Sequence, residues 1–537
     1  MKRRDFLRSA VPAAILPSIL NGFSIKAYGA SSPLVQALMD TTTETDHVLV
    51  LIQLSGGNDG LNMVIPNDIY STYYNARTNI AIPQNKILPL NGYGNSGLHP
   101  AMTGLQTMYN EGKLAIVQSV SYPTPNFSHF RATDIWMSAS DTNTYLSSGW
   151  AGRYLDTEYP DYPEKYPNSS MTDPLAIQIG SITSLALQGP EVSMGISISD
   201  PASFYNFING VQDPTPDTPW GNELSFVRQI ASQTQQYAAV VKTAAAKVPA
   251  QGTYPSSNDL AAQLKIVAQL IKGGLKTRVY MVNTGGFDNH SGQVTTTDTT
   301  TGTHANLMTR ISSAIKAFSD DLKGLGIEDR VVGMTFSEFG RRVKSNANYG
   351  TDHGVASPLF VFGKNVKSGV LGSSPKISDK SSGTEVISDN VPMQYDFRSV
   401  YASLLGDWFC VNSNTLQTVM LKNYQNLPLI GTSSCRAALA ITGLNDLNRA
   451  DSDQLIINYP NPFADTTKIT FRTKGGHTMV QVMDTQGRIL SVLTDKMYAP
   501  GLYTVNFDSG MLPVGIYYAR FQNGPVQQVR PMLKVKP

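Results

Sequence analysis

Five short clusters of polar residues carry side chains that can hold a divalent metal ion. Carboxylates and imidazoles that meet at one place repel each other, or stay partly protonated, unless a cation neutralises them. Imidazole together with carboxylate suits Zn, Mn or Fe better than Ca, which prefers ligands that are all oxygen. The candidate metal ligands are Asp59, Asp288, His290, Glu338, Asp352 and His353.

The spacing of these residues favours a shared site. Asp288 and His290 are two positions apart, so both side chains point the same way in an extended segment. Asp352 and His353 are adjacent, and a turn is needed for both to reach one site. Three of the seven histidines lie in such clusters, each near a glycine or a carboxylate: His129, His290 and His353.

Each cluster taken alone also fits a structural role. Asp59 lies in a Gly-Gly-Asn-Asp-Gly stretch that is typical of a turn, and Ser128 fits the N-cap of a helix that begins after it. His290 and His304 fit surface positions beside a threonine-rich loop. The joint placement of the clusters relative to predicted strands favours a functional site.

The clusters lie at the ends of these predicted β-strands. Apolar runs predict strands at residues 47–54, 113–120, 278–283, 330–336 and 359–362. Four clusters come just after a strand and the fifth just before one. Apolar residues at helical spacing predict a helix over residues 307–322. This order predicts an α/β fold, with a mostly parallel sheet flanked by helices and ligands bound beyond the carboxyl ends of its strands.

Residues 453–537 are predicted to form a separate, small all-β sandwich. Seven short runs of β-branched and aromatic residues alternate there with turn dipeptides such as Gly475-Gly476 and Asn523-Gly524. Seven strands in about 85 residues is a β-sandwich pattern. From the pattern alone, an immunoglobulin-like spacer or a sugar-binding module stays open.

The composition excludes several classes of protein. Of the 537 residues 41% are hydrophobic and 15% are charged, which excludes a mostly disordered chain. Lys+Arg 42 and Asp+Glu 40 nearly balance, which argues against a nucleic-acid partner. No apolar run reaches the ~18–20 residues of a transmembrane helix. Two cysteines, Cys410 and Cys435, allow a disulfide but no cysteine-based zinc site.

Residues 1–29 are predicted to be a removable signal peptide, and residues 30–46 a linker. A basic start precedes a short apolar run, and small residues follow it. The paired Arg3 and Arg4, followed by Phe-Leu, resemble a twin-arginine (Tat) signal, with an ordinary Sec signal as the alternative. A Tat signal implies the Tat translocon as a partner and a stage in the periplasm.

The predicted sandwich resembles the type A C-terminal sorting domain of type IX secretion. The motifs are Tyr-Pro-Asn-Pro-Phe at residues 459–463, Asp-Thr-Gln-Gly-Arg at 484–488 and Gly-Ile-Tyr-Tyr at 515–518, followed by a basic end. This resemblance implies that type IX secretion machinery carries the protein to the cell surface or the medium. The functional part is then the α/β domain at residues 47–450.

The five clusters together resemble a bacterial family, commonly Tat-exported, known as the domain-of-unknown-function family fifteen hundred and one. Its motifs are Gly-Gly-x-Asp-Gly, Ser-His-Phe, Gly-Trp-Asp-x-His, Glu-Phe-Gly-Arg and Gly-Thr-Asp-His-Gly. They correspond to residues 56–60, 128–130, 286–290, 338–341 and 350–354, with Phe287 where the family usually has Trp. The family is similar to the alkaline phosphatase–sulfatase superfamily, which implies that fold.

The superfamily implies roles for single residues. Asp59 corresponds to a metal-binding residue after the first strand, and Ser128 to a nucleophile at a helix N-terminus. Asp288 and His290 correspond to a later ligand pair, for which His304 is a substitute. His353 corresponds to the last ligand.

Two departures limit this correspondence. Phe339, after Glu338, stands where the superfamily has a histidine ligand, and a ring carbon cannot coordinate metal. A sulfatase needs Cys or Ser in [C/S]-x-P-x-R. Neither cysteine has that context, and the stretch that begins at Ser121 lacks the arginine, so an ordinary formylglycine sulfatase is not expected.

The sequence therefore predicts a secreted, metal-dependent hydrolase that acts on small or polymeric phosphate or related esters. The metal polarises the ester and activates Ser128 or a water, and Arg341 or Arg342 holds the substrate anion. The alternative is a non-catalytic exported surface or binding protein with a degenerate metal site, which the phenylalanine at position 339 favours. A third reading is a chain that assists a secreted partner.

Overall fold

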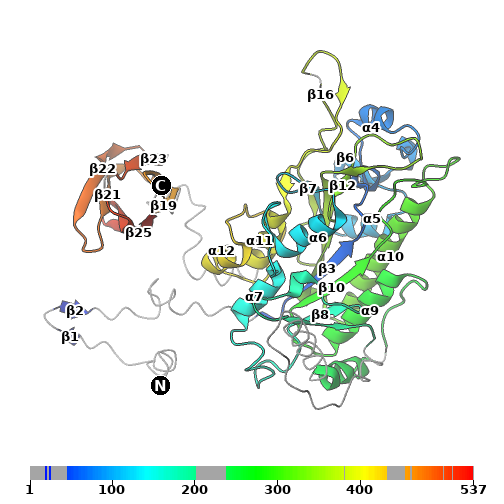
Figure 1. The fold of residues 1–537 in the computed structure, drawn as a ribbon, viewed down its shortest axis with the longest axis horizontal. Coiled ribbons are helices and arrows are strands. Elements are labelled where there is room, and N and C mark those ends of the chain that lie inside the picture. Colours follow the sequence, from blue (N-terminus) through cyan, green and yellow to red (C-terminus); the bar gives the residue numbers. More distant parts are fainter. Residues whose placement is uncertain are drawn as a thin grey trace, which may run out of the picture. The chain divides into compact units, whose positions relative to one another are not determined.

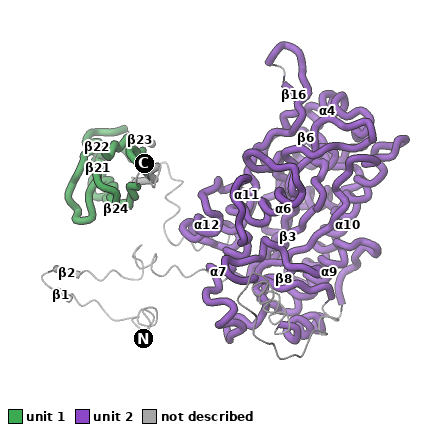
Figure 2. The backbone as a smooth tube through the Cα atoms, viewed as in Figure 1, with its two compact units in different colours: residues 1–40, 437–537 green, residues 41–436 purple. Residues whose placement is uncertain are grey.

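The computed structural model describes two compact units, residues 41–436 and residues 437–537 with 1–40 (Figure 2). The described residues are 45–200, 237–431 without 249 and 380, 454–459, and 463–535 without 500 and 511. Two short antiparallel strands, β1 (Ser18–Leu20) and β2 (Phe23–Ile25), are also described. Apart from these strands and residues 45 and 46, the predicted signal peptide and linker lie outside the described residues.

A nine-stranded sheet forms the centre of the larger unit. Its order is β15 (Gly369–Leu371), β7 (Leu114–Ser121), β14 (Ser357–Phe362), β11 (Val331–Phe336), β3 (Val48–Leu54), β10 (Val279–Thr284), β8 (Ala176–Ile179) and β9 (Gly195–Ile198), and β18 (Tyr395–Asp396) also pairs with β7. Neighbours pair in parallel, except that β14 runs antiparallel to β7 and β11.

Helices cover both faces of this sheet (Figure 1). One core packs alternate side chains of β3, such as Val50 and Ile52, against the helices α5 (Thr103–Asn110), α9 (Asp259–Lys272) and α10 (Thr303–Gly324). The other core packs Leu49 and Leu51 against the helices α6 (His129–Ser138), α7 (Trp150–Glu158), α11 (Phe397–Asp407) and α12 (Ser413–Met420). A strand buried on both faces reads as a continuous apolar run, which is why the sequence reveals it.

The predicted α/β class is confirmed. Each of the five predicted strands overlaps an observed strand of the sheet, and the predicted helix is α10. The one antiparallel strand, β14, could not be read from its apolar run, because such a run carries no direction. Its reversal brings its amino end, just after His353, to the edge where its parallel neighbours have their carboxyl ends.

Shorter elements complete the larger unit. A three-stranded sheet contains β4 (Val64–Pro66), β6 (Tyr93–Leu98) and β5 (Leu88–Leu90), beside the helices α3 (Gly60–Met63) and α4 (Tyr70–Ala76). Two antiparallel pairs are β12 (Gly340–Arg341) with β13 (His353–Gly354), and β16 (Ser378–Asp379) with β17 (Val386–Ile387). Single 3₁₀ turns are η1 (Gln84–Lys86), η2 (Leu185–Leu187) and η3 (Glu328–Arg330).

The smaller unit contains two antiparallel sheets that share one core. The first sheet has the order β19 (Gln454–Tyr459), β20 (Thr466–Thr473) and β23 (Gly501–Asp508). The second has the order β22 (Ile489–Tyr498), β21 (Gly476–Met483), β24 (Gly515–Asn523) and β25 (Val526–Lys534). Phe471 and Phe507 of the first sheet pack with Val480 and Phe521 of the second. The predicted small all-β domain is confirmed.

Deleting residues 453–537 is expected to leave the larger unit folded, because the buried residues of its two cores all lie between Val48 and Ile430. Thermal unfolding followed by circular dichroism should show the main transition of residues 30–537 retained in residues 30–452. In cells, the shortened protein should collect in the periplasm. Secretion at the normal level would contradict the sorting role that the sequence implies.

Candidate metal centre

One edge of the central sheet gathers the predicted site residues. The chain leaves β3 toward Asp59, β10 toward Asp288 and β11 toward Glu338, each at the carboxyl end of a strand. His353 comes just before β14, whose amino end lies at the same edge because this strand is reversed. The chain leaves β7 at this edge too, and leads to His129 at the start of α6.

Asp288 lies among three histidines. Its Oδ1 is 3.1 Å from Nε2 of His290 and 3.3 Å from Nε2 of His353, and its Oδ2 is 3.5 Å from Nε2 of His129. The Nε2 atoms of His290 and His353 are 3.0 Å apart. The ligand atoms that His129, Asp288 and His353 offer all lie within 4.8 Å of one another. Three imidazole nitrogens and a carboxylate therefore converge on the space of one ion.

The other ring nitrogen of each histidine faces an oxygen that can only accept. Nδ1 of His353 is 2.9 Å from the carbonyl oxygen of Phe127. Nδ1 of His129 is 2.8 Å from Oε1 of Glu338. A neutral ring must donate from Nδ1 to such an acceptor, so its Nε2 carries the free lone pair.

His290 follows the same pattern. Its Nδ1 is 3.3 Å from Oδ1 of Asp352, so a neutral ring that donates there presents the lone pair of its Nε2 to Asp288. Metal-bound histidines characteristically donate their second N–H to a carboxylate or a backbone carbonyl, which fixes both the tautomer and the ring orientation. All three rings of this centre meet that condition.

The protonation states at the centre suit metal binding. Partial burial lowers the pKa of His353, because it penalises the imidazolium. Partial burial acts to raise the pKa of Asp288, but the hydrogen bonds and positive charge of Arg341 outweigh it and leave this pKa below its ordinary value. Neutral rings and an ionised carboxylate are the forms that bind a divalent ion.

Two predicted ligands contact the histidines instead of Asp288. Glu338 is buried, and its Oε1 accepts from the backbone N–H of Gly56 at 2.8 Å as well as from His129. Asp352 is exposed, and its Oδ1 lies beside Nδ1 of His290. Each carboxylate holds the Nδ1 side of a ring, which is the side away from the convergent Nε2 atoms.

Arg341 is buried, and all three nitrogens of its guanidinium donate to protein oxygens. Nε donates to the carbonyl of Gly57 at 2.6 Å, and Nη1 to the carbonyl of Thr351 at 2.8 Å. Nη2 donates to Oδ1 of Asp288 at 2.6 Å and to the carbonyl of Gly56. This side chain connects three loops. Because each of its guanidinium nitrogens already donates to a protein oxygen, the group is not positioned to bind a substrate anion with two parallel hydrogen bonds.

Asp59 belongs to a buried ion pair with Arg77. Nη1 of Arg77 donates to both carboxylate oxygens, at 2.9 and 2.7 Å, and Nε2 of Gln293 donates to Oδ2 at 2.6 Å. Burial acts to raise the pKa of Asp59, but the charge of Arg77 outweighs it and lowers this pKa. The carboxylate is thus ionised and neutralised by a guanidinium.

His304, the substitute ligand, lies in the same buried region. Its Nε2 is 3.2 Å from Oδ1 of Asn58, and its ring is 5.9 Å from the ring of His99. Its buried Nδ1 has no hydrogen-bond partner in the described structure. Burial lowers the pKa of His304 to about 4. The structure therefore groups His290, and not His304, with Asp288.

Ser128 and His129 show what the sequence pattern missed. Ser128 is the N-cap residue of α6 and is exposed, and its side chain makes no capping hydrogen bond. The next residue, His129, faces Asp288 and Glu338. The Ser-His-Phe cluster is the signal for both residues, and the family resemblance gives a chemical role to Ser128 alone.

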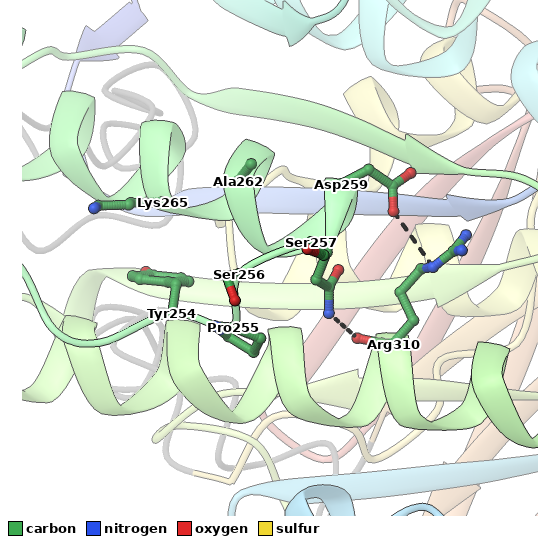
Figure 3. Close-up of a pocket in the computed structure, with 9 residues that line it drawn as sticks. Tyr254, Pro255, Ser256, Ser257, Asp259, Ala262, Lys265 and Arg310 are labelled. Carbon is green, nitrogen blue, oxygen red and sulfur yellow. Dashed lines mark hydrogen bonds and ion pairs between the residues drawn. The ribbon is translucent and has the colours of Figure 1, made fainter.

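A separate pocket opens at the amino end of α9 (Figure 3). Its lining includes Tyr254, Lys265 and the ion pair of Asp259 with Arg310, whose Oδ1 and Nε are 3.4 Å apart. The pocket contains none of the residues that the sequence predicts for the site.

Comparisons with known proteins identify two regions of the chain. The protein family described as "Protein of unknown function (DUF1501)" matches residues 222–420, which contain Asp288, His290 and His353. The family described as "Secretion system C-terminal sorting domain" matches residues 458–534. No curated protein matches the chain.

Solved structures are similar to this chain at low identity. The PsFucS1 sulfatase from Pseudoalteromonas sp. is 10% identical over 89% of this chain and 87% of its own, with a TM-score of 0.30. A protein in the alkaline phosphatase superfamily from Vibrio parahaemolyticus is 10% identical over 92% and 84%, with a TM-score of 0.32. The alkaline phosphatase from the Antarctic bacterium TAB5 is 12% identical over 59% and 91%, with a TM-score of 0.24.

The sorting domain implies export to the cell surface or beyond. Within the described residues, no helix has the length and apolar character needed to cross a membrane. Cys410 is disulfide-bonded, and disulfides persist in oxidising compartments outside the cytosol. Cys435 lies outside the described residues.

Stability is expected to fall as the pH drops from about 6.5 to 4. The His304 ring stays neutral in the folded protein down to its pKa of about 4, whereas it takes up a proton near its ordinary pKa of 6.5 in the unfolded chain. The unfolded state therefore binds more protons in this range, so the free energy of unfolding rises with pH there.

Urea unfolding at pH 7 and at pH 4.5 measures this dependence. The loss due to His304 should be on the order of 3 kcal/mol, and His304→Gln should show a correspondingly smaller loss between the two pH values. An equal pH dependence in the wild type and in this variant would contradict the assignment.

Proposed function

We propose that the protein is an exported, metal-dependent hydrolase of phosphate or related esters, with one divalent ion held by His129, Asp288, His290 and His353. The observation that carries this proposal is the convergence of the Nε2 atoms of three histidines on the Asp288 carboxylate. Three neutral imidazoles and one carboxylate form a donor set for Zn, Mn or Fe, since Ca and Mg prefer oxygen ligands.

The accessibility of the centre favours catalysis over a purely structural site. The side chain of Asp288 is 48% exposed and that of His290 is 46% exposed. Structural metal sites are closed, whereas catalytic sites keep a position open for water or substrate. When bound, the ion would supply Lewis-acid polarisation of the ester and a water of lowered pKa.

Neighbouring side chains position these ligands. Glu338 and Asp352 fix the rings of His129 and His290 by accepting from Nδ1, and the carbonyl of Phe127 does the same for His353. Arg341 keeps the Asp288 carboxylate ionised and oriented. We therefore assign positioning roles to Glu338, Asp352 and Arg341.

We propose Arg342, rather than the buried Arg341, as the arginine that binds the substrate anion. It is exposed, and its backbone N–H donates to the carbonyl of Asp352 at 3.0 Å, beside the partner of His290. Side chains alternate along an extended segment, so Arg341 points into the protein while Arg342 points away from it. A guanidinium at this position suits bidentate binding of a phosphate or sulfate group.

Ser128 is the proposed nucleophile. It is exposed, precedes His129 in the chain, and its hydroxyl is not used as a helix cap. The amino end of α6 favours the negative charge of a bound anion. A water is the alternative nucleophile, and the Ser128→Ala variant separates the two.

A non-catalytic surface protein with one retained metal ion is the second candidate. Phe339 stands in place of a ligand, and Arg77 neutralises Asp59 where a second cation is otherwise expected. Export through the Tat translocon, with a periplasmic stage before type IX secretion, is part of our proposal. It rests on the Arg3-Arg4 pair and on the sorting domain.

Metal analysis of the purified protein should find about one Zn, Mn or Fe ion per chain. His353→Ala should lower the metal content with little change in circular dichroism, because the residue lies at the rim and outside the apolar cores. His477→Ala, in the C-terminal domain, is the matched control and should keep the ion. A wild-type protein without metal, when purified free of chelators, would overturn the proposal.

The same assay tests Asp59. Loss of metal in Asp59→Asn would support the ligand role that the sequence predicts. Retained metal would limit Asp59 to its ion pair with Arg77.

Steady-state hydrolysis of aryl phosphates and aryl sulfates tests the two proposed substrate contacts. Ser128→Ala should abolish turnover and keep the metal if Ser128 is the nucleophile, whereas unchanged turnover would assign attack to a water. Arg342→Ala should lower kcat/KM about 10- to 100-fold, because a charge-assisted hydrogen bond to the substrate is lost. Arg342→Lys should recover part of this loss, and an Arg342→Ala variant with wild-type kcat/KM would contradict the assignment.

A further inference from the structure

Two phenylalanines beside the metal centre are exposed to solvent. The relative exposure of Phe130 is 86%, and that of Phe127 is 42%. Phe130 follows His129 in the first turn of α6, and the carbonyl of Phe127 accepts from Nδ1 of His353. Both rings are thus attached to backbone that the centre itself fixes in place.

Aromatic contacts connect the ring of Phe127 to two of the histidines. The centroid of the Phe127 ring is 6.5 Å from that of Phe339, with the rings edge to face. Phe339 in turn lies 4.9 Å from the His129 ring and 4.5 Å from the His353 ring. The ring of Phe127 is therefore joined through Phe339 to the imidazoles of the centre, and Phe130 is next to His129 in the chain.

We propose that Phe127 and Phe130 bind the organic group of the ester, so that the protein selects esters of ring-bearing alcohols over small alkyl esters. This inference rests on the proposed function. The acid group of such a substrate lies at the centre beside Arg342, and the ring of its alcohol lies on the two phenylalanines. The occupant is the substrate, because the Phe127 ring adjoins Phe339, which contacts the rings of His129 and His353.

The test uses inert anions, so it does not depend on turnover. Isothermal titration calorimetry of the metal-loaded protein compares phenylphosphonate with methylphosphonate, and benzenesulfonate with methanesulfonate. At least one phenyl anion should bind about tenfold more tightly than its methyl counterpart, because a ring buries apolar area against an aromatic surface. Phe130→Ala and Phe127→Ala should each reduce this preference, measured as the ratio of the dissociation constants of the methyl and phenyl anions.

A matched control tests whether the loss is specific to the two phenylalanines. Tyr74→Ala removes another exposed aromatic ring, on α4, and should keep the full preference. Equal binding of phenyl and methyl anions by the wild type, or an unchanged preference in both phenylalanine variants, would overturn this inference and leave the proposed function standing. Binding of neither kind of anion would overturn the proposed function as well.

Discussion

The buried guanidinium of Arg341 holds the loops of the metal centre in one arrangement. It donates to Gly57 in the loop after β3, to Asp288 in the loop after β10, and to Thr351 in the loop before β14. The loops approach so closely that a Cβ on Gly56 would lie 2.4 Å from the backbone nitrogen of Asp288. A glycine is required there, and its φ of +126° is also one that other residues rarely adopt. The Gly-Gly turn and the arginine thus serve one purpose, which is to hold Asp288 against the three histidines.

Two carboxylates at this edge of the sheet, those of Asp59 and Asp288, have their negative charge compensated in different ways. Asp59 is paired with Arg77 in the interior, where removing one partner of such a pair costs on the order of 3–5 kcal/mol. Asp288 shares its charge with Arg341 but stays half exposed and faces three imidazole rings. The guanidinium of Arg77 neutralises the first carboxylate fully inside the protein. Arg341 pairs with the second, whose exposed side stays open to the single ion that we propose.

The sequence predicts the strands of the central sheet and the edge at which the candidate site residues gather. Buried parallel strands appear in the sequence as apolar runs, and polar clusters follow them at this edge. It also places Asp288, His290 and His353 in the clusters that meet. It cannot show which oxygen holds each ring, since the partner of His353 is a backbone carbonyl that has no side-chain signature. The sequence also does not reveal that Arg341 is buried and Arg342 is exposed. The two arginines are adjacent, and only the structure shows which face of the strand points into the protein.

Phe339 stands where the superfamily resemblance implies a histidine, and its ring has a packing role in the structure. A ring at this position cannot bind metal, but it packs against the rings of both His129 and His353. It also fills the space beside Gly57, where a Cβ would lie 2.3 Å from the phenylalanine ring. Packing of this kind restricts the rotation of the two imidazoles, so less conformational entropy is lost when they bind an ion. Phe339 therefore helps to preorganise two rings of the metal centre that we propose.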